Sequence, residues 1–142
     1  MKTKIIALDV YGTFLYTEDY DNCMCPREGF SELVRKCQDN DIIIVTSSDT
    51  DTTFLNADLE ESLGRIKLTP NVFDTYYWLR TNPKDYSKII EDYKIKPEEL
   101  FVIGDREDKD LAWPIEHGCS TRLVPNFGDK GEYFDLSTIE IP

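Results

Sequence analysis

The chain of 142 residues has little histidine and few cysteines. It contains a single histidine, His117, and four cysteines, and Cys23 and Cys25 are separated by only one residue. That spacing is too short for an easy disulfide, and one histidine supplies a Cys/His zinc site poorly. The counts therefore favour reduced thiols, as in a cytosolic protein, over a disulfide framework or a zinc domain.

Long apolar runs are also missing. No stretch approaches the ~20 apolar residues that a membrane-spanning helix needs. Lys2 and Lys4 are followed by only four apolar residues before Asp9, too few for a signal peptide. We therefore expect a cytoplasmic protein that has no membrane partner.

Positive charge is scarce. Lysine and arginine total 16 against 28 aspartates and glutamates, which gives a formal net charge of −12. Broad nucleic-acid binding needs basic side chains against the phosphates, so no nucleic-acid partner is expected. A small phosphorylated substrate is not excluded, because a bound cation and a few local bases can reverse the field within one cleft.

What the sequence does contain is an alternation of short apolar runs and helical patterns. Strands are expected at 5–8, 42–45, 76–79, 100–103 and 121–124. Helices are expected at 26–39, 52–63, 84–93 and 107–117. Strands separated by helices imply right-handed crossovers and a parallel sheet. The sequence thus predicts an α/β fold, and its length predicts one domain over 1–142.

Polar residues follow three of the predicted buried strands: Asp9, Thr46 and Asp105. In a parallel sheet the site lies beyond the carboxyl ends of the strands, so we expect the three to converge. Two neighbouring carboxylates repel each other, which favours a hard cation with oxygen ligands, and Mg²⁺ suits a site that also holds a phosphate.

The same residues can perform phosphoryl chemistry. A carboxylate such as Asp9 can attack a phosphoryl group and form an aspartyl phosphate. Thr46 can donate a hydrogen bond to a phosphoryl oxygen, and the turn at Gly12 can present backbone N–H groups to the same oxygens. A nearby lysine would offset charge in the transition state.

The order of these features resembles the haloacid dehalogenase superfamily of hydrolases, most of which are phosphatases with a Rossmann-like fold. The family's D-x-D-G-T motif corresponds to "DVYGT" at residues 9–13, and its second motif, a strand ending in Thr or Ser, ends at Thr46. The motif lysine matches Lys84, with Arg80 and Lys88 as rivals. The fourth motif matches "FVIGDREDKDLA", through Gly104, Asp105 and Asp110.

The resemblance implies a Rossmann-like three-layer sandwich around a central parallel sheet, and a role for each matched residue. Asp9 would be the nucleophile and a Mg²⁺ ligand, and the backbone carbonyl of Tyr11 and the carboxylate of Asp105 would be further ligands. Asp110 would orient a water or Lys84, although a plain acid at a helix N-terminus stays open as its alternative.

The remaining matched residues would bind the phosphoryl group. These are Gly12, Thr13 and Ser47, together with the catalytic Thr46 and Lys84.

The segments between the motifs are filled by the predicted helices and strands, so no room remains for a separate cap domain of the kind that many family members carry. The resulting open site suits a phosphoprotein, or a phosphorylated small molecule enclosed by a second copy of the chain or by the segment 15–25.

Tyr11 departs from the phosphatase motif, in which the second aspartate is the general acid and base. Tyrosine has a reference pKa of about 10 and is a poor base near neutrality. The sequence therefore predicts a Mg²⁺-dependent phosphatase or phosphotransferase that is slowed by Tyr11.

Two alternatives remain open. One is a catalytically weak binding module of the same fold. The other is a hydrolase like the haloacid dehalogenases, which resemble this chain in having tyrosine at that position but need no magnesium and carry a helical cap.

Overall fold

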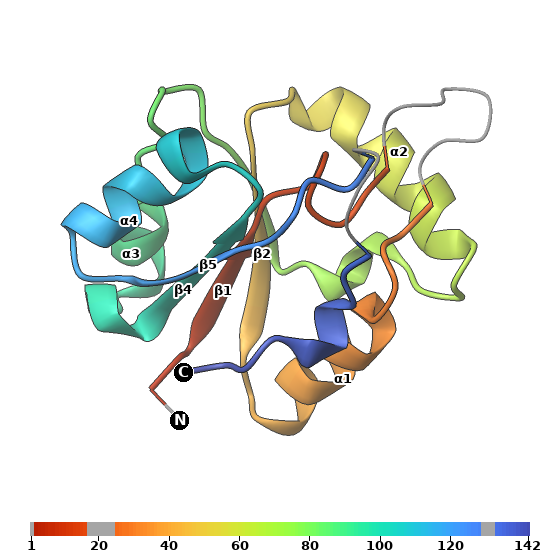
Figure 1. Cartoon of the computed structure of the whole chain (residues 1–142), viewed down its shortest axis with the longest axis horizontal. Coiled ribbons are helices and arrows are strands. Elements are labelled where there is room, and N and C mark those ends of the chain that lie inside the picture. The colour runs from red at the N-terminus through yellow and green to blue at the C-terminus, as the bar shows by residue number, and fades with distance from the viewer. Residues whose placement is uncertain (1, 17–24, 129–132) are drawn as a thin grey trace.

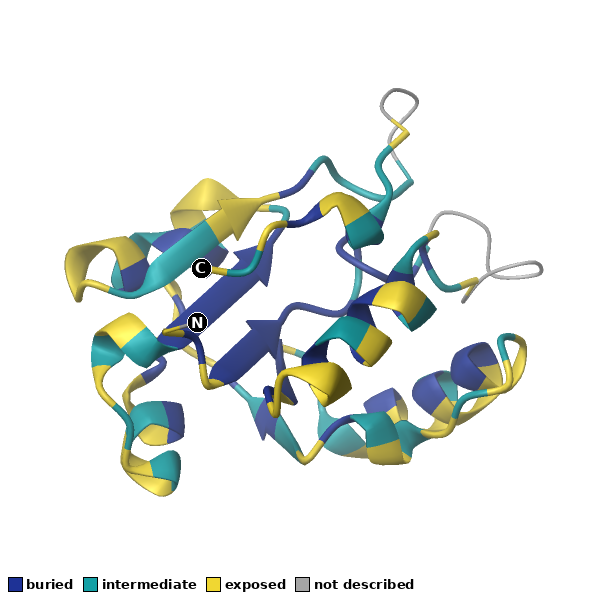
Figure 2. Ribbon diagram, turned by 90° about the horizontal axis from the view of Figure 1, so that it is seen from below, coloured by how far each residue is buried: buried dark blue, intermediate teal, exposed yellow. Residues whose placement is uncertain are grey.

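The computed structural model describes residues 2–16, 25–128 and 133–142, which form a five-stranded parallel sheet flanked by helices (Figure 1). The strands are β1 (Ile5–Leu8), β2 (Ile43–Ser48), β3 (Thr75–Trp78), β4 (Leu100–Gly104) and β5 (Ser120–Leu123). Their order across the sheet is β3-β2-β1-β4-β5. Central β1 is apolar and buried along its whole length, as a strand covered on both faces should be (Figure 2).

Two helices cover each face of the sheet (Figure 1). They are α1 (Phe30–Asp39) and α2 (Thr52–Gly64) on one face, and α3 (Ser87–Tyr93) and α4 (Ala112–Glu116) on the other. Helix α1 buries the predicted stripe of Phe30, Leu33, Val34 and Cys37. The predicted three-layer α/β sandwich is confirmed, and the described residues include no separate cap domain. No helix among them is long and apolar enough to cross a bilayer.

Three predicted helices differ from the structure. The helix expected over 26–39 begins at Phe30, because Gly29 before it has a left-handed φ of +85°. The helix expected over 84–93 begins at Ser87, where the Asp85 carboxylate accepts a hydrogen bond from the Ser87 N–H at 2.8 Å. The helix expected over 107–117 is divided into a π-helical turn, Glu107–Leu111, and the short α4. Pro114 has no N–H to donate, so it fits the first turn of α4.

The loops that leave β1, β4 and β5 meet at the carboxyl edge of the sheet. The Asp9 N–H donates to the Ile103 carbonyl at 3.0 Å, and the Phe127 N–H donates to the Gly12 carbonyl at 2.7 Å. The side chains that follow these strands therefore share one edge. Within the segment 15–25, suggested above as a cover for the site, residues 17–24 lie outside the described residues.

Candidate active site and metal centre

Three aspartates meet at this edge of the sheet. Asp9 follows β1, Asp105 follows β4, and Asp110 lies in the π-helical turn. One carboxylate oxygen of each lies within 4.8 Å of the others. Asp9 and Asp110 are buried and Asp105 is half-buried. The cluster is a set of oxygen ligands of the kind that a hard divalent cation prefers.

Lys84 neutralises part of this cluster. Its Nζ lies 2.9 Å from Asp9 Oδ1 and 2.8 Å from Asp110 Oδ1, and it donates to the Ser47 carbonyl at 2.6 Å. The side chain is only 1% exposed. An ammonium has three N–H donors, and these acceptors use all of them.

The two rival cations lie elsewhere. Arg80 stacks on the Trp78 ring at 3.5 Å, and the exposed Lys88 pairs with Asp92 at 3.4 Å. Of the three candidates, Lys84 is therefore the one that the structure brings to Asp9.

The electrostatics of the site favour a further positive charge. Burial, with a further contribution from the nearby Asp110, raises the pKa of Asp9 to about 7, although Lys84 opposes the shift. Burial alone would lower the pKa of Lys84, but Asp9 and Asp110 together raise it above its usual range, so the amine stays charged. Three carboxylates thus face one ammonium.

The raised pKa of Asp9 has a consequence for stability without a metal. Since native Asp9 holds its proton more tightly than the unfolded chain does, its contribution to stability falls as the pH rises from about 4 to about 7. A divalent cation would remove this penalty by taking the place of the proton.

Asp110 is held from both sides. While Oδ1 contacts Lys84, Oδ2 accepts a hydrogen bond from the Arg106 N–H at 3.1 Å. The turn can bring Asp110 so close because residue 104 is glycine: a Cβ there would lie 2.6 Å from the Asp110 Cβ. With both oxygens engaged, Asp110 is placed to orient Lys84.

The turn after β1 packs against the aspartates. Gly12 has a φ of +86°, and a Cβ at this position would lie 2.6 Å from Asp105 Oδ2. The Thr13 hydroxyl donates to Asp9 Oδ2 at 3.0 Å and also lies 3.3 Å from Asp105 Oδ1. The sequence "YGT" therefore supplies close backbone approach and a donor that holds Asp9.

The end of β2 is arranged less simply than the motif predicts. Thr46 pairs in register with Leu8, so the pleat places it on the sheet face opposite to Asp9, and Ser47 on the same face as Asp9. The buried Thr46 hydroxyl has no hydrogen-bond partner among the described residues. The structure brings the Ser47 backbone to Lys84, and it shows no hydrogen bond from Thr46 to the cluster.

Tyr11 borders the same site but is tied to a neighbouring helix. It lines a hollow of about 250 Å³ together with Asp9, Asp105 and Lys84. Its hydroxyl donates a hydrogen bond to the carboxylate of Asp58 on α2. The Tyr11 hydroxyl is thus occupied by a partner outside the aspartate cluster.

Sequence reasoning missed several residues that line this hollow. Asn126 donates to Asp105 Oδ2, and Lys109 forms an ion pair with Asp49 across the hollow's rim. Asn126 follows β5 closely, as Asp9 follows β1 and Asp105 follows β4, so the rule of polar residues after strands could have found it. The Asp49–Lys109 ion pair joins segments that are 60 residues apart, so no pattern among neighbouring residues in the sequence predicts it.

Arg27 is a further residue that the sequence did not reveal. It is buried, and its Nη1 donates to the carbonyls of Thr13 at 3.1 Å and Pro125 at 2.6 Å. Its Nε donates to the Phe134 carbonyl at 3.2 Å. Arg27 therefore fastens the turn after β1 to the segment after β5.

No family model and no curated protein matches the sequence. Solved structures do. A HAD family enzyme from Bacteroides thetaiotaomicron, in complex with magnesium and inorganic phosphate, superimposes with a TM-score of 0.72 at 12% identity, covering 90% of this chain and 97% of the other. The D,D-heptose 1,7-bisphosphate phosphatase from B. bronchiseptica, complexed with magnesium and phosphate, superimposes with a TM-score of 0.64 at 20% identity, covering 85% of this chain and 80% of the other.

A third structure is much longer than this chain. It is the N-terminal part of protein BF1531 from Bacteroides fragilis, containing a phosphatase domain complexed with Mg, with a TM-score of 0.65 and 18% identity. The match covers 88% of this chain but 37% of that one. The chain has the haloacid dehalogenase fold. In this fold the aspartate cluster lies at the carboxyl edge of the sheet, where ligands of open α/β sheets bind.

Loss of the Lys84 charge should destabilise the metal-free protein. Removing one partner of a buried ion pair leaves uncompensated charge, and we expect Lys84→Met to lower the free energy of unfolding by about 3 kcal/mol in EDTA at neutral pH. The measurement is denaturant unfolding followed by circular dichroism.

Lys88→Met is the matched control, because Lys88 is an exposed lysine paired with Asp92 on α3. Its loss should cost less than about 0.5 kcal/mol. Equal effects of the two substitutions would contradict a special role for Lys84 in holding the cluster.

Proposed function

We propose that the protein is a magnesium-dependent phosphatase or phosphotransferase in which Asp9 is the nucleophile. The observation that carries the proposal is the aspartate cluster: three carboxylates with oxygens within 4.8 Å, balanced by one buried lysine. The cluster therefore has an excess of negative charge, which a divalent cation would balance, and such a cation would also attract a phosphate group. The bound magnesium and phosphate in structures of the same fold support the assignment.

The donor set fits magnesium. Asp9 and Asp105 would hold it, with the backbone carbonyl of Tyr11 as a further ligand. Asp110, which pairs with Lys84 and accepts a hydrogen bond from the Arg106 N–H, would position Lys84 beside the metal. When bound, magnesium would stabilise negative charge on the phosphoryl oxygens.

The chain's own groups prepare Asp9 for attack. Lys84 and Thr13 each contact one Asp9 oxygen and fix the plane of the carboxylate. In the proposed first step, an Asp9 oxygen forms a bond to phosphorus while the bond to the leaving oxygen breaks. Lys84, already charged, would offset the charge that develops on the phosphoryl group. Water would then release phosphate from Asp9 in the second step.

Proton transfer is the weak point of this reaction. A leaving oxygen that departs as a strong base needs a proton from a general acid. Tyrosine is a poor donor and acceptor near neutral pH, and the Tyr11 hydroxyl already donates to Asp58. The proposed enzyme would therefore work best on aryl or acyl phosphates, and its phosphorylated intermediate would be slow to hydrolyse. Substrates in the form of phosphorylated small molecules or phosphoproteins fit a site over which the described residues place no cap domain.

Removal of the nucleophile tests the proposal. Wild-type protein should hydrolyse phenyl phosphate in the presence of magnesium and lose this activity in EDTA. Asp9→Asn should abolish turnover, because the amide does not act as the nucleophile, while Asp39→Asn, which changes an exposed aspartate of α1, should have no effect. The readout is phosphate release.

Absence of turnover in wild-type protein would contradict the proposal and favour a binding module of this fold. Chloride release from 2-chloropropionate without magnesium would favour a dehalogenase instead.

Magnesium affinity provides an independent test. Asp105→Asn should weaken magnesium binding about tenfold or more, because it replaces a charged ligand with a neutral one. Isothermal titration calorimetry on the wild type, Asp105→Asn and the control Asp39→Asn measures the effect. Uptake of magnesium with equal affinity by all three proteins would show that the metal binds elsewhere.

The role of Tyr11 can be tested by substitution. Tyr11→Asp restores a carboxyl group at the acid/base position and should speed hydrolysis of an alkyl phosphate by about 10²-fold or more, with a smaller gain on phenyl phosphate. Tyr11→Phe separates the effects, since it removes the hydroxyl bond to Asp58 without adding an acid, and it should give no such gain. A folded, magnesium-binding Tyr11→Asp that is no faster on either substrate would refute this account of Tyr11.

A further inference from the structure

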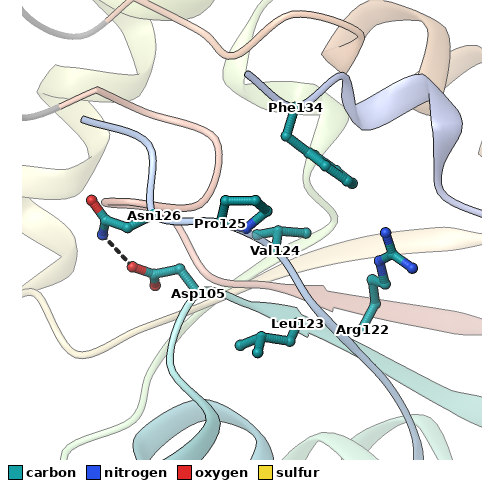
Figure 3. A pocket seen from close by; sticks show the side chains of 7 residues that line it. All are labelled: Asp105, Arg122, Leu123, Val124, Pro125, Asn126 and Phe134. Carbon is teal, nitrogen blue, oxygen red and sulfur yellow. Dashed lines mark hydrogen bonds between the residues drawn. The ribbon is translucent and has the colours of Figure 1, made fainter. Parts of the chain in front are cut away.

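A larger cavity lies beside the proposed reaction site. It has a volume of about 570 Å³ (Figure 3). Its lining residues are Asp105, Arg122, Leu123, Val124, Pro125, Asn126 and Phe134. Asp105 and Asn126 also line the smaller hollow that contains Asp9 and Lys84. The two spaces therefore adjoin at the hydrogen-bonded Asp105 and Asn126.

The two ends of the cavity differ in character. Asp105 and Asn126 stand at one end and Arg122 at the other, with Val124, Pro125 and Leu123 between them (Figure 3). Arg122 pairs in register with Ile103, two residues before Asp105. With a rise of ~3.3 Å per residue, Arg122 lies roughly 7 Å back along the sheet from Asp105. That span suits a small organic molecule with one end at the aspartate cluster.

Arg122 is available to bind a ligand. The chain carries a net charge of −12, yet no carboxylate of the described residues forms an ion pair with Arg122. Its guanidinium lies 5.4 Å from the centroid of the Phe134 ring. A ring at this distance attracts the cation and limits its motion, while leaving its N–H groups free to bind oxygen atoms.

We infer that this cavity binds the leaving group of the substrate, and that Arg122 selects leaving groups that carry a second anionic group. The inference rests on the proposed function, which places the phosphoryl group at Asp9. The carbon skeleton would lie along Val124 and Pro125, and a carboxylate or second phosphate would contact Arg122. Arginine binds both anions through paired N–H donors, so the shared chemistry is an oxyanion at the far end of the molecule.

Three aryl phosphates with the same ring test this specificity. 4-Carboxyphenyl phosphate and 1,4-phenylene bisphosphate each carry a second anion, whereas 4-carbamoylphenyl phosphate carries a neutral amide of similar shape. Dissociation constants are measured by calorimetry with magnesium in the Asp9→Asn background, where no turnover interferes. We expect the anionic probes to bind about tenfold more tightly than the neutral one. The stronger of the two anionic probes identifies the carboxylate or the phosphate as the preferred group.

Variants of Arg122 locate the source of the preference. Arg122→Gln should reduce the ratio of anionic to neutral affinity to near one, and Arg122→Lys should restore part of it, because charge remains while the paired donors are lost. Arg35→Gln, which removes an exposed arginine from α1, should keep the full ratio. A merely structural role of Arg122 would not produce recovery by lysine.

Equal affinity for all three probes, failure of all three to bind, or a preference that survives Arg122→Gln would overturn the inference. The proposed function is judged separately, by wild-type turnover of unsubstituted phenyl phosphate. Turnover without any anionic preference would leave the phosphatase assignment standing and remove the role of Arg122.

Discussion

The buried ammonium of Lys84 is the interaction on which the site depends. Its three N–H groups contact Asp9 after β1, the Ser47 carbonyl in β2 and Asp110 in the turn after β4. A charged amine that is 1% exposed is costly to bury unless every donor is satisfied. The three segments must therefore adopt their positions together, and the sheet holds them there because β1 pairs with both β2 and β4.

Close backbone approach and buried hydrogen bonds support this centre. Gly12 and Gly104 leave no Cβ where Asp105 and Asp110 need space. Arg27 joins the Thr13 and Pro125 carbonyls, so it fixes the turn that carries the Thr13 hydroxyl and the segment that carries Asn126. These contacts hold Asp9 and Asp105 near each other despite their repulsion. Carboxylates kept together by the fold can provide a cation with a preformed set of ligands.

The sequence predicted the sheet well because its evidence is local. Uninterrupted apolar runs such as 5–8 and 100–103 are typical of strands that are buried on both faces of a sheet. In a parallel sheet, the residue after each such strand then lies at the carboxyl edge, where ligands bind. Lys84 was harder to assign, since Arg80 and Lys88 lie close to it in sequence and burial separates them. The Tyr11–Asp58 bond, the contacts of Arg27 and the face occupied by Thr46 depend on tertiary packing and strand register, which leave no pattern in neighbouring residues. Pro114 predicts a break in the helix expected over 107–117, but not where the break lies. The π-helical turn Glu107–Leu111 sets that position, because α4 begins directly after it and so has Pro114 in its first turn.

The position of Tyr11 gives the two proposals a common physical basis. If Tyr11 gave its proton to a leaving group, its hydroxyl would have to break the hydrogen bond to Asp58. Helix α2 would then lose its hydrogen bond to the turn after β1. In the proposed phosphatase, such a site would gain little rate from proton transfer and would depend more on how the substrate is placed. Binding energy from a remote part of a substrate can be used for positioning at the reacting centre. A contact between Arg122 and a second anionic group would supply that energy at the end of the cavity opposite Asp105, and substrates that lack the anion would lose it. Tight placement of an activated leaving group is therefore the form of catalysis that the two proposals together assign to these residues.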